Sequence, residues 1–588
     1  MSESASKLLS SPYGEVAYDK FKLRNRAFVD KSGVIKALDS QDMTLYPVLL
    51  RPRRFGKSTF VQMIKCFYDI SFRGRYRKLF SGTDIYREKL KSHNTYHVLD
   101  FDFSAISGRN VQELVSGFIL ALRSGIVNFK NRYPDFVFAP QEDEKKTPSA
   151  YIKSFINAYE EYPSKRLLYV MIDEYDNFAN SILSSDLELF RTITASGGFL
   201  KDFYAALKEG AKNSIEKIFI TGVSSVSLDS LTSGFNIALN VTSDACFNEY
   251  AGFTGDELKM IAPLLVDLNA VGTTAEEVVE LMKPVYDGYC FSSETTKTVY
   301  NSSMCLYYLN MVRKKGQLLE PEKCLDPASD INSSKLGQLF GIAEDGVADA
   351  VIETYLGEGI FRLDSLAENI NLNDKARYDR TQLLSMLYYL GYLTIDPAMS
   401  TASRLALKIP NLFMSRLFAK CVVDLRLKSS SVFGERTLDV SSMLARSDDI
   451  SGFAASCTEF LSSIFTNQVL GHMSEMALNL ALYAKLDSVK GIFAELQKSL
   501  RISGKGEKYA DLAITVNEGN SSQCTYLIEL KYMKKKDAKE ATAAELEKLK
   551  NEARRQAAEY SAALEFRGRQ VKAYAMIFSG SECLYCGH

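Results

Sequence analysis

The 588-residue sequence has only four histidines, and its formal net charge at pH 7 is −1. So few histidines argue against metal or general-base chemistry that is spread widely over imidazole groups. A net charge this close to zero predicts no overall attraction to nucleic acid, so such binding has to come from a local basic surface. Functional sites must therefore be sought in local clusters of residues.

The sequence also lacks long apolar runs and a dense cysteine pattern. No run of about 18 apolar residues occurs, so no membrane span is expected. The start, Met-Ser-Glu-Ser-Ala-Ser-Lys, has no apolar core typical of a signal peptide. Ten scattered cysteines predict free thiols in a reducing compartment. We therefore expect a soluble intracellular protein of the cytoplasm or nucleus, with an organelle as a further option.

A Gly-Lys-Ser triplet at the start of an apolar-periodic stretch is the most informative motif. Residues 50–58 read Leu-Arg-Pro-Arg-Arg-Phe-Gly-Lys-Ser and follow an apolar run. In a strand–loop–helix of this kind, backbone N–H groups face phosphates, Lys57 reaches the terminal phosphates and the Ser58 hydroxyl holds Mg²⁺. The motif is incomplete, because Arg51 stands where its first glycine is usual. The loop residues expected to contact a nucleotide are Arg53, Arg54, Phe55, Gly56, Lys57, Ser58 and Thr59.

A second motif, at residues 167–176, reads Leu-Leu-Tyr-Val-Met-Ile-Asp-Glu-Tyr-Asp. The unbroken apolar run is typical of a strand covered on both faces of a parallel sheet, and ligands bind at the carboxyl ends of such strands. We expect Asp173 to bind the water shell of magnesium and Glu174 to polarise the attacking water. The alternative is a buried strand followed by a solvated acidic turn. Thr221, at the end of a later strand, is a candidate for sensing the γ-phosphate, although a simple turn also explains it.

Several motifs follow one another in a fixed order: residues 30–32, 51–58, 172–176, 233–236, 286–289 and 299–301. This series resembles the AAA-ATPase-like family of many bacteria and some eukaryotes, whose members carry an Arg-Pro-Arg-Arg-Phe-Gly-Lys-Ser loop. The resemblance spans nearly the whole chain and implies that the missing glycine is a family habit. It also implies a C-terminal nuclease-like domain of the PD-(D/E)XK type.

The fold class that we predict is α/β, with a P-loop ATPase core, a helical lid, a winged-helix-like connector and a C-terminal α/β restriction-endonuclease-like domain. Strand-like and helical stretches alternate to about residue 250, which predicts a mostly parallel sheet with helices on both faces. The expected parts are a leader at 1–40, the ATPase core at 41–253, the lid at 254–334, the connector at 335–450 and the nuclease-like domain at 451–588.

The connector contains a helix followed by a β-hairpin, which resembles a winged helix. Such modules bind DNA or serve as rigid connectors. The hairpin has few basic residues, among them Arg404 and Lys408, and this favours the connector.

Near the C-terminus, Asp511 and the pair Glu529 and Lys531 lie in two short strand-like segments joined by a polar turn. Glu529 and Lys531 share one strand face because they are two residues apart. This is the residue set of PD-(D/E)XK nucleases, in which two carboxylates hold Mg²⁺ and the lysine positions and helps to deprotonate the attacking water. The alternative is an ordinary cross-strand charge pattern.

The resemblance adds three accessory positions, Glu475, Gln556 and Tyr560, which match residues that the family supplies around this core. The lysines at 534–536 follow the second strand and are assigned to a phosphate backbone.

We therefore predict an ATPase, with ATP and Mg²⁺ as cofactors, joined to a Mg²⁺-dependent nuclease that acts on nucleic acid. One alternative is a non-enzymatic scaffold with an ATPase fold and an inert nuclease fold. Another is an active ATPase with a nuclease module that only binds DNA. Protein partners are an open option, no membrane partner is expected, and the sequence does not indicate the oligomeric state.

Overall fold

The structure is a computed structural model that describes residues 8–183, 186–194, 198–226, 236–327, 333–368, 370, 377–429, 450–487, 492–502, 506–516, 524–563 and 570–588. Ser233, Gly234 and Phe235 of the predicted motif series lie outside these residues. The chain divides into two compact units. Unit 1 comprises Met1–Ile331, Gln338–Glu344 and Arg362–Phe413, and unit 2 comprises Asn332–Gly337, Asp345–Phe361 and Met414–His588.

Unit 1 is built on a parallel sheet with the order β2-β3-β4-β1-β5, in which every strand pair is parallel. Its strands are β1 (Pro47–Leu50), β2 (His97–Asp102), β3 (Leu168–Asp173), β4 (Ile215–Gly222) and β5 (Leu239–Asn240). All residues of β3 are buried, as expected of a strand covered on both faces. The prediction of a parallel sheet from unbroken apolar runs is therefore confirmed.

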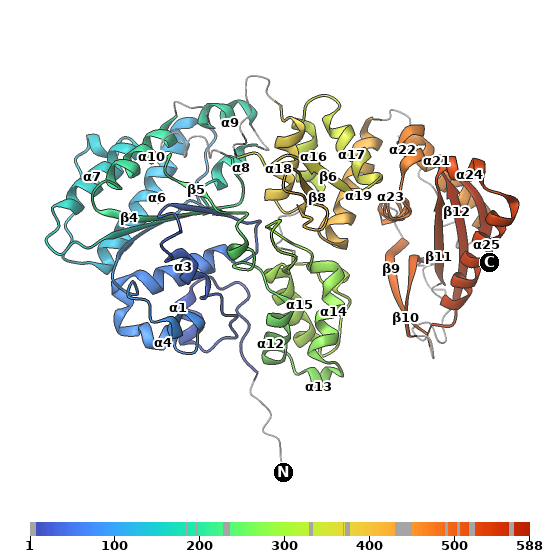
Figure 1. Cartoon of the computed structure of the whole chain (residues 1–588), viewed down its shortest axis with the longest axis horizontal. Helices are drawn as coiled ribbons and strands as arrows, with labels where there is room; N and C mark the ends of the chain where they lie inside the picture. Colours follow the sequence, from blue (N-terminus) through green and yellow to red (C-terminus); the bar gives the residue numbers. More distant parts are fainter. Residues whose placement is uncertain are drawn as a thin grey trace, which may run out of the picture. The chain divides into compact units, whose positions relative to one another are not determined.

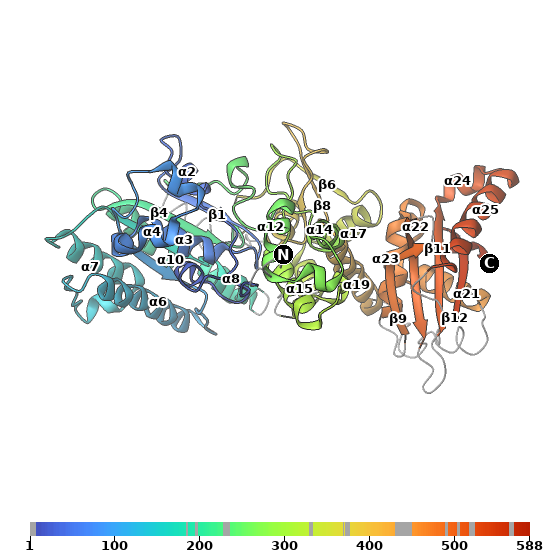
Figure 2. The same cartoon turned by 90° about the horizontal axis from the view of Figure 1, so that it is seen from below.

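Helices cover both faces of this sheet (Figures 1 and 2). On one face α3 (Lys57–Tyr68) packs against β3, and on the other α6 (Val111–Arg132) packs against β2 and against α7 (Pro148–Glu160), which also contacts α10 (Phe199–Gly210). Because the strands are parallel, their carboxyl ends lie at one edge of the sheet. The loop after β1 and the acidic residues after β3 meet at that edge.

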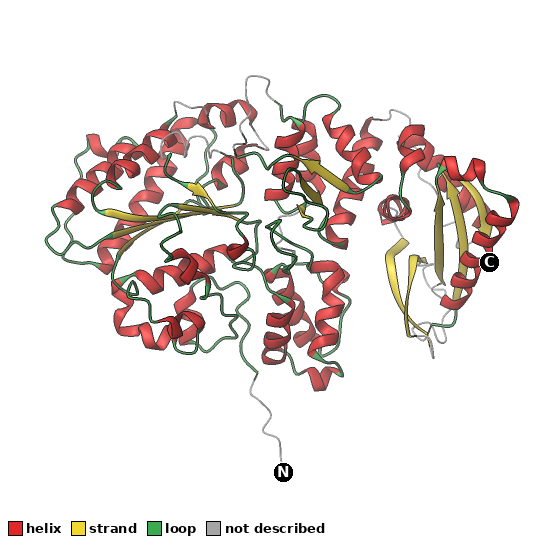
Figure 3. Cartoon of the chain, in the orientation of Figure 1, coloured by secondary structure: helices red, strands yellow, loops and turns green. Residues whose placement is uncertain are grey.

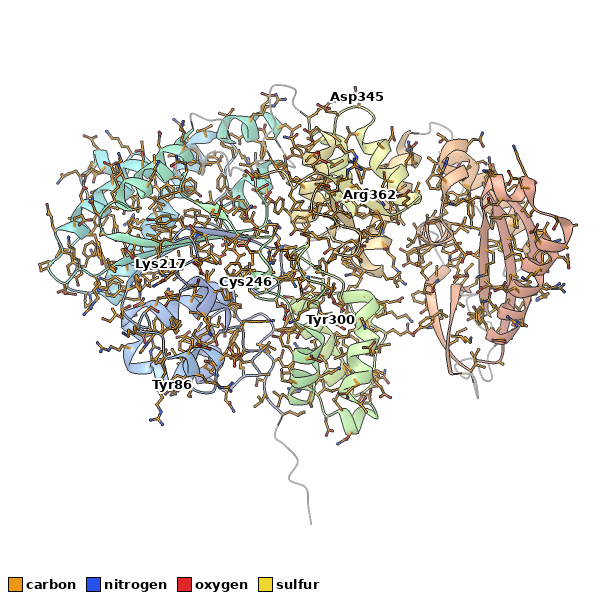
Figure 4. All side chains as sticks on the ribbon, viewed as in Figure 1. Tyr86, Lys217, Cys246, Tyr300, Asp345 and Arg362 are labelled. Atoms are coloured by element: carbon orange, nitrogen blue, oxygen red, sulfur yellow. The ribbon has the colours of Figure 1, made fainter. Side chains whose placement is uncertain are left out.

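The lid that follows the sheet is helical. It contains α12 (Gly255–Leu265), α14 (Ala275–Tyr286) and α15 (Ser302–Lys315). The first two begin with capping boxes, at Thr254 and at Thr274, which satisfy backbone N–H groups of the first turn. Tyr300, labelled in Figure 4, is buried in the apolar core of this lid.

A winged-helix-like module follows, as predicted. It consists of α18 (Arg380–Tyr389) and a three-stranded sheet with the order β6-β8-β7, formed by β6 (Ile360–Leu363), β7 (Thr394–Ile395) and β8 (Leu405–Lys408). A capping box at Asp379 begins the helix. Gly391, with φ of +84°, follows the helix in a conformation that favours glycine.

Unit 2 contains a mixed sheet with the order β13-β12-β11-β10-β9, whose strands are drawn in yellow in Figure 3. Its strands are β9 (Ile492–Ile502), β10 (Gly506–Val516), β11 (Cys524–Met533), β12 (Gln570–Ser579) and β13 (Glu582–Gly587). Only the β11–β12 pair is parallel among the described ladders of this sheet. The crossover between these two strands carries α25 (Ala543–Tyr560), which packs on both of them, while α23 (Glu475–Asp487) packs on β9 and β11.

The other α-helices of the described residues are α1 (Tyr18–Leu23), α2 (Val34–Leu38), α4 (Tyr76–Phe80), α5 (Asp84–Glu88), α8 (Asn177–Leu183), α9 (Leu187–Thr194), α13 (Leu268–Val271), α16 (Ser333–Ile342), α17 (Val347–Leu356), α19 (Leu412–Ser429), α21 (Ile450–Ile464), α22 (Asn467–His472) and α24 (Lys535–Glu540). Short 3₁₀ helices span Ile70–Arg75, Asp143–Lys145, Ala245–Phe247 and Pro321–Lys323.

Candidate nucleotide and nuclease sites

The loop after β1 has the backbone geometry of a phosphate-binding loop. Gly56 has φ of +94° and directly precedes α3, and Arg54 also has a positive φ, of +72°. Both residues are exposed. The first N–H groups of this 12-residue helix and the positive end of its dipole lie directly after this loop, in the arrangement that binds phosphate in such loops.

The lysine and the serine of this loop lie against the acidic end of β3. Lys57 is 4% exposed, and its Nζ donates to the Pro52 carbonyl at 3.3 Å and lies 3.5 Å from Glu174 Oε1. The Ser58 side chain is hydrogen-bonded to the Asp173 carboxylate. The structure thus brings together the four residues that the sequence assigned to phosphate, magnesium and water.

Asp173 is a buried carboxyl with further carboxylates beside it. Burial, reinforced by Glu174, raises its pKa to about 7, although the Ser58 hydrogen bond and Lys57 oppose this. Asp102 lies directly opposite Asp173 on β2 and also raises that pKa. A cation at this edge would relieve the repulsion among these oxygens, and Mg²⁺ prefers oxygen ligands. The donor set therefore fits a nucleotide with its Mg²⁺.

Thr221 and Asp176 make contacts that hold the sheet edge together. The Thr221 hydroxyl donates to the Leu49 carbonyl at 2.7 Å, so its proton is directed at the neighbouring strand. Its sensing role stays a prediction. Asp176 is fully buried and accepts hydrogen bonds from Val223 N at 3.0 Å and from Ser224 N and Oγ, each at 2.7 Å. These contacts give Asp176 a structural role and leave Glu174 as the better candidate for polarising water.

Arg51 explains how the loop forms without its first glycine. Its side chain is 1% exposed, and its guanidinium donates to the carbonyls of Leu50 and Thr242 through Nη1 and of Phe247 through Nη2, each at 2.8 Å. It also lies over the Phe291 ring, at 4.1 Å from the centroid. Arg51 therefore fastens the base of the loop to the segment that leads into the lid, a role that the motif alone did not reveal.

The remaining predicted loop residues have distinct surroundings. Arg53 Nη2 donates to Asn177 Oδ1 at 2.9 Å, which joins the loop to the segment after β3. Phe55 is buried, and its ring packs edge-on against Tyr289 at 4.9 Å between centroids. Thr59 lines a cavity of about 140 Å³ beside the loop.

That cavity is largely apolar and is formed by the leader, by α3 and by the lid. Residues that line it include Tyr13, Tyr18, Phe28, Lys31, Phe60, Met63, Phe253, Ile261 and Leu306. Sequence reasoning missed all of them except Lys31, which lies in the motif at residues 30–32. Lys31 Nζ donates to Glu257 Oε2 at 2.7 Å and to the Glu249 carbonyl at 2.8 Å. It thereby ties the leader to the first turn of α12.

In unit 2, the three predicted nuclease residues converge on one side of the sheet. The carboxylate of Asp511, which lies on β10, accepts from Leu530 N at 2.9 Å and therefore lies beside the β11 residue between Glu529 and Lys531. Lys531 Nζ lies 2.6 Å from Glu529 Oε1. Asp511 and Glu529 are both buried, with 8% and 3% of their surface exposed. The side chains therefore do not point to opposite faces of the sheet.

The comparisons with known proteins match two parts of the chain. A family model described as a predicted AAA-ATPase matches residues 12–232, and one described as the PD-(D/E)XK nuclease superfamily matches residues 503–587. The chain has an AAA-ATPase-like domain and a C-terminal PD-(D/E)XK nuclease superfamily domain. No curated protein matches the sequence.

Two solved structures show weak similarity at 10% identity. Drosophila ORC bound to poly(dA/dT) DNA and Cdc6 matches 78% of this chain and 61% of that chain, with a TM-score of 0.22. Drosophila ORC bound to GC-rich DNA and Cdc6 matches 81% of this chain and 63% of that chain, with a TM-score of 0.21. This chain therefore spans less than two thirds of either matched chain, and TM-scores this low establish no common fold.

Two of the three predicted accessory residues contact the predicted nuclease residues or their neighbours. The Tyr560 hydroxyl is 2.6 Å from Glu529 Oε2. Glu475 Oε1 lies 3.7 Å from Lys531 Nζ, and its Oε2 accepts from Tyr532 N at 3.2 Å. Gln556 Oε1 is buried and has no hydrogen-bond partner among the described residues. Tyr560 and Glu475 therefore lie beside Glu529 and Lys531, whereas the role of Gln556 stays a prediction.

No group of three or more histidine, cysteine or acidic residues within the described ranges is arranged to hold a metal ion by itself. Asp511 and Glu529 would therefore hold Mg²⁺ as a pair, which fits an ion that usually keeps several waters. In the part of the chain that the structure describes, no helix is long and apolar enough to cross a membrane.

A pH dependence follows from Asp511 of the PD-(D/E)XK domain. Burial, reinforced by Glu529, raises its pKa from 3.8 to about 7. Because the folded state binds this proton more tightly than the unfolded state, stability without metal is expected to fall as pH rises from 3.8 through about 7. Thermal unfolding with a chelator should give a lower melting temperature at about pH 8.5 than at about pH 5.5, and Asp511→Asn should remove part of this difference. An identical pH dependence in Asp511→Asn would contradict the assignment.

Proposed function

We propose that this protein is an ATPase joined to a Mg²⁺-dependent nuclease, and that ATP binding or hydrolysis governs the access of nucleic acid to the second site. The observation that supports this most strongly is that each unit has its own convergent set of side chains with a distinct chemistry. Lys57, Ser58, Asp173 and Glu174 suit a nucleotide with Mg²⁺. Asp511, Glu529 and Lys531 suit a metal-dependent attack of water on a phosphodiester.

In the proposed ATPase site, backbone N–H groups from Gly56 onward and the Lys57 ammonium bind the phosphates. Ser58 and Asp173 hold Mg²⁺, which supplies charge neutralisation of the phosphoryl oxygens. The apolar cavity formed by the leader, α3 and the lid receives the base. Glu174 orients the attacking water and takes up its proton.

In the proposed nuclease site, Asp511 and Glu529 hold Mg²⁺, which supplies Lewis-acid polarisation of the phosphodiester. The Lys531 ammonium orients the attacking water. The exposed side chains of Lys534 and Lys536 follow β11 directly and would contact the phosphate backbone of the substrate. We also propose that the domains have the bounds predicted from sequence, with the winged-helix-like module at residues 335–450 as a connector.

Glu174→Gln tests the division of labour in the ATPase site. The amide keeps the shape of the side chain but is a very poor base, so ATP binding should remain while hydrolysis falls by on the order of 10²–10⁴-fold. ATP affinity by calorimetry and phosphate release at saturating ATP with Mg²⁺ measure the two effects. Glu161→Gln, at an exposed position, is the matched control. Hydrolysis by Glu174→Gln at the unmodified rate would exclude the proposed role of Glu174.

A further inference from the structure

β9 has an unusual backbone at one residue. Gln497 has φ of +51°, while its neighbours stay in register with β10, as Lys498 pairs with Ala510 and Leu496 with Leu512. Only the pair of Gln497 with Asp511 is missing from this ladder. The backbone therefore turns locally at the residue opposite the candidate nuclease carboxylate, without inserting a residue.

Two contacts reflect this local turn. Lys498 Nζ lies 2.9 Å from Glu495 Oε1, although residues three apart on a regular strand point to opposite faces. The Leu496 carbonyl accepts a hydrogen bond from Arg416 Nη2 on α19 at 3.1 Å. Packing around β9 thus supports a conformation that a glutamine rarely adopts.

Among the described residues, three of the six positive φ values at non-glycine residues fall in the candidate sites of this protein. Among the described residues they occur at Asn25, Arg54, Lys89, Asn94, Glu174 and Gln497. Arg54 and Glu174 belong to the candidate nucleotide site. Strained backbone of this kind tends to persist where it serves a function. The strained residue opposite Asp511 is Gln497, so we expect Gln497 to have a function at this carboxylate.

The side chain of Gln497 contacts the Asp511 carboxylate directly. Its Nε2 donates to Asp511 Oδ1 at 2.8 Å, while Leu530 N donates to Asp511 Oδ2 at 2.9 Å. The two donors fix both oxygens of the carboxylate. Each oxygen keeps a second lone pair for a cation. Because the amide is neutral, it orients the carboxylate but does not compete with Mg²⁺ for it. An ammonium in the same place would compete.

We propose that Gln497 is a positioning residue of the nuclease site, which holds the Asp511 carboxylate in the orientation that receives Mg²⁺. This inference rests on the proposed nuclease function. Gln497 lies outside residues 503–587, which match the nuclease superfamily, and it acts through Asp511 and not on the substrate. Removal of such a hydrogen-bond partner of a metal ligand typically weakens metal affinity by about 10–100-fold.

The test compares Gln497→Gly and Gln497→Ala in the full chain. Both remove the amide, but only glycine adopts the positive φ without strain, so the glycine variant should have the higher melting temperature. If Gln497 positions Asp511, both variants should nevertheless weaken Mg²⁺ binding equally, by about 10–100-fold in nucleotide-free calorimetric titrations. In plasmid nicking, the Mg²⁺ concentration for half-maximal rate should rise by a similar factor, and saturating Mg²⁺ should restore most of the rate.

The variant Asp511→Asn distinguishes a failure of the positioning role from a failure of the proposed nuclease site, because it removes the metal site itself. The relevant Mg²⁺ binding is the part that Asp511→Asn abolishes. If this binding is unchanged in both Gln497 variants, or if it weakens only as far as the melting temperature falls, the positioning role is wrong and the nuclease site stands. If the unmodified protein shows no Mg²⁺ binding that Asp511→Asn removes, both the positioning role and the proposed nuclease site are wrong.

Discussion

Lys57→Ala is expected to weaken ATP binding by on the order of 10²-fold or more, since loss of one partner of a buried charge pair costs about 2–5 kcal/mol. The Lys57 ammonium is almost fully buried and lies at the start of α3, between the loop and Glu174. Without it, the terminal phosphates of the nucleotide would lie near Glu174 and lack the positive charge that the ammonium adds to that of Mg²⁺. Calorimetric titration with ATP and Mg²⁺ measures the loss.

Lys78→Ala is the matched control, because Lys78 is an exposed lysine on α4 and the substitution removes the same charge from the chain. It should bind ATP like the unmodified protein. Equal ATP affinity of Lys57→Ala and Lys78→Ala would refute the phosphate-binding role of the loop.

The second large effect is expected at the nuclease site, where Lys531→Ala should abolish DNA cleavage but spare metal binding. The lysine acts on the attacking water, and loss of a positioned acid–base group costs about 10²–10⁴-fold in rate. Asp511→Asn should lose both cleavage and the stabilisation by Mg²⁺, because the amide is a poor ligand for a hard cation. ATP binding should be normal in both variants, since the nucleotide loop belongs to unit 1.

Lys548→Ala provides the control for charge, because Lys548 is an exposed lysine on α25. Melting temperature with and without Mg²⁺ reports metal binding independently of cleavage. Cleavage by Lys531→Ala at the rate of Lys548→Ala would exclude the catalytic role of Lys531.

The sequence predicted those parts of the molecule that depend on local pattern. The buried strand before Asp173 was visible as an unbroken apolar run, and the turn into α3 was visible as Gly-Lys-Ser. Glu529 and Lys531 were placed on one face by their spacing of two residues. Each of these features is set by neighbours in the chain, which is why pattern and spacing were enough.

The features that escaped prediction arise from contacts between distant segments. The structural role of Arg51 was not predicted, because the carbonyls of Thr242 and Phe247 that it binds lie far along the chain. The cavity beside the loop combines the leader with the lid, and no local pattern connects those segments. Gln497 lies in a strand-like sequence, where nothing about a glutamine indicates a positive φ.

Nicking of supercoiled plasmid in the presence of Mg²⁺ and ATP tests the central claim most directly, with the unmodified protein, Glu529→Ala and Lys57→Ala compared side by side. The account predicts Mg²⁺-dependent nicking by the unmodified protein, none by Glu529→Ala, and nicking by Lys57→Ala that no longer responds to ATP. Equal nicking by the unmodified protein and Glu529→Ala, or none by the unmodified protein, would contradict it.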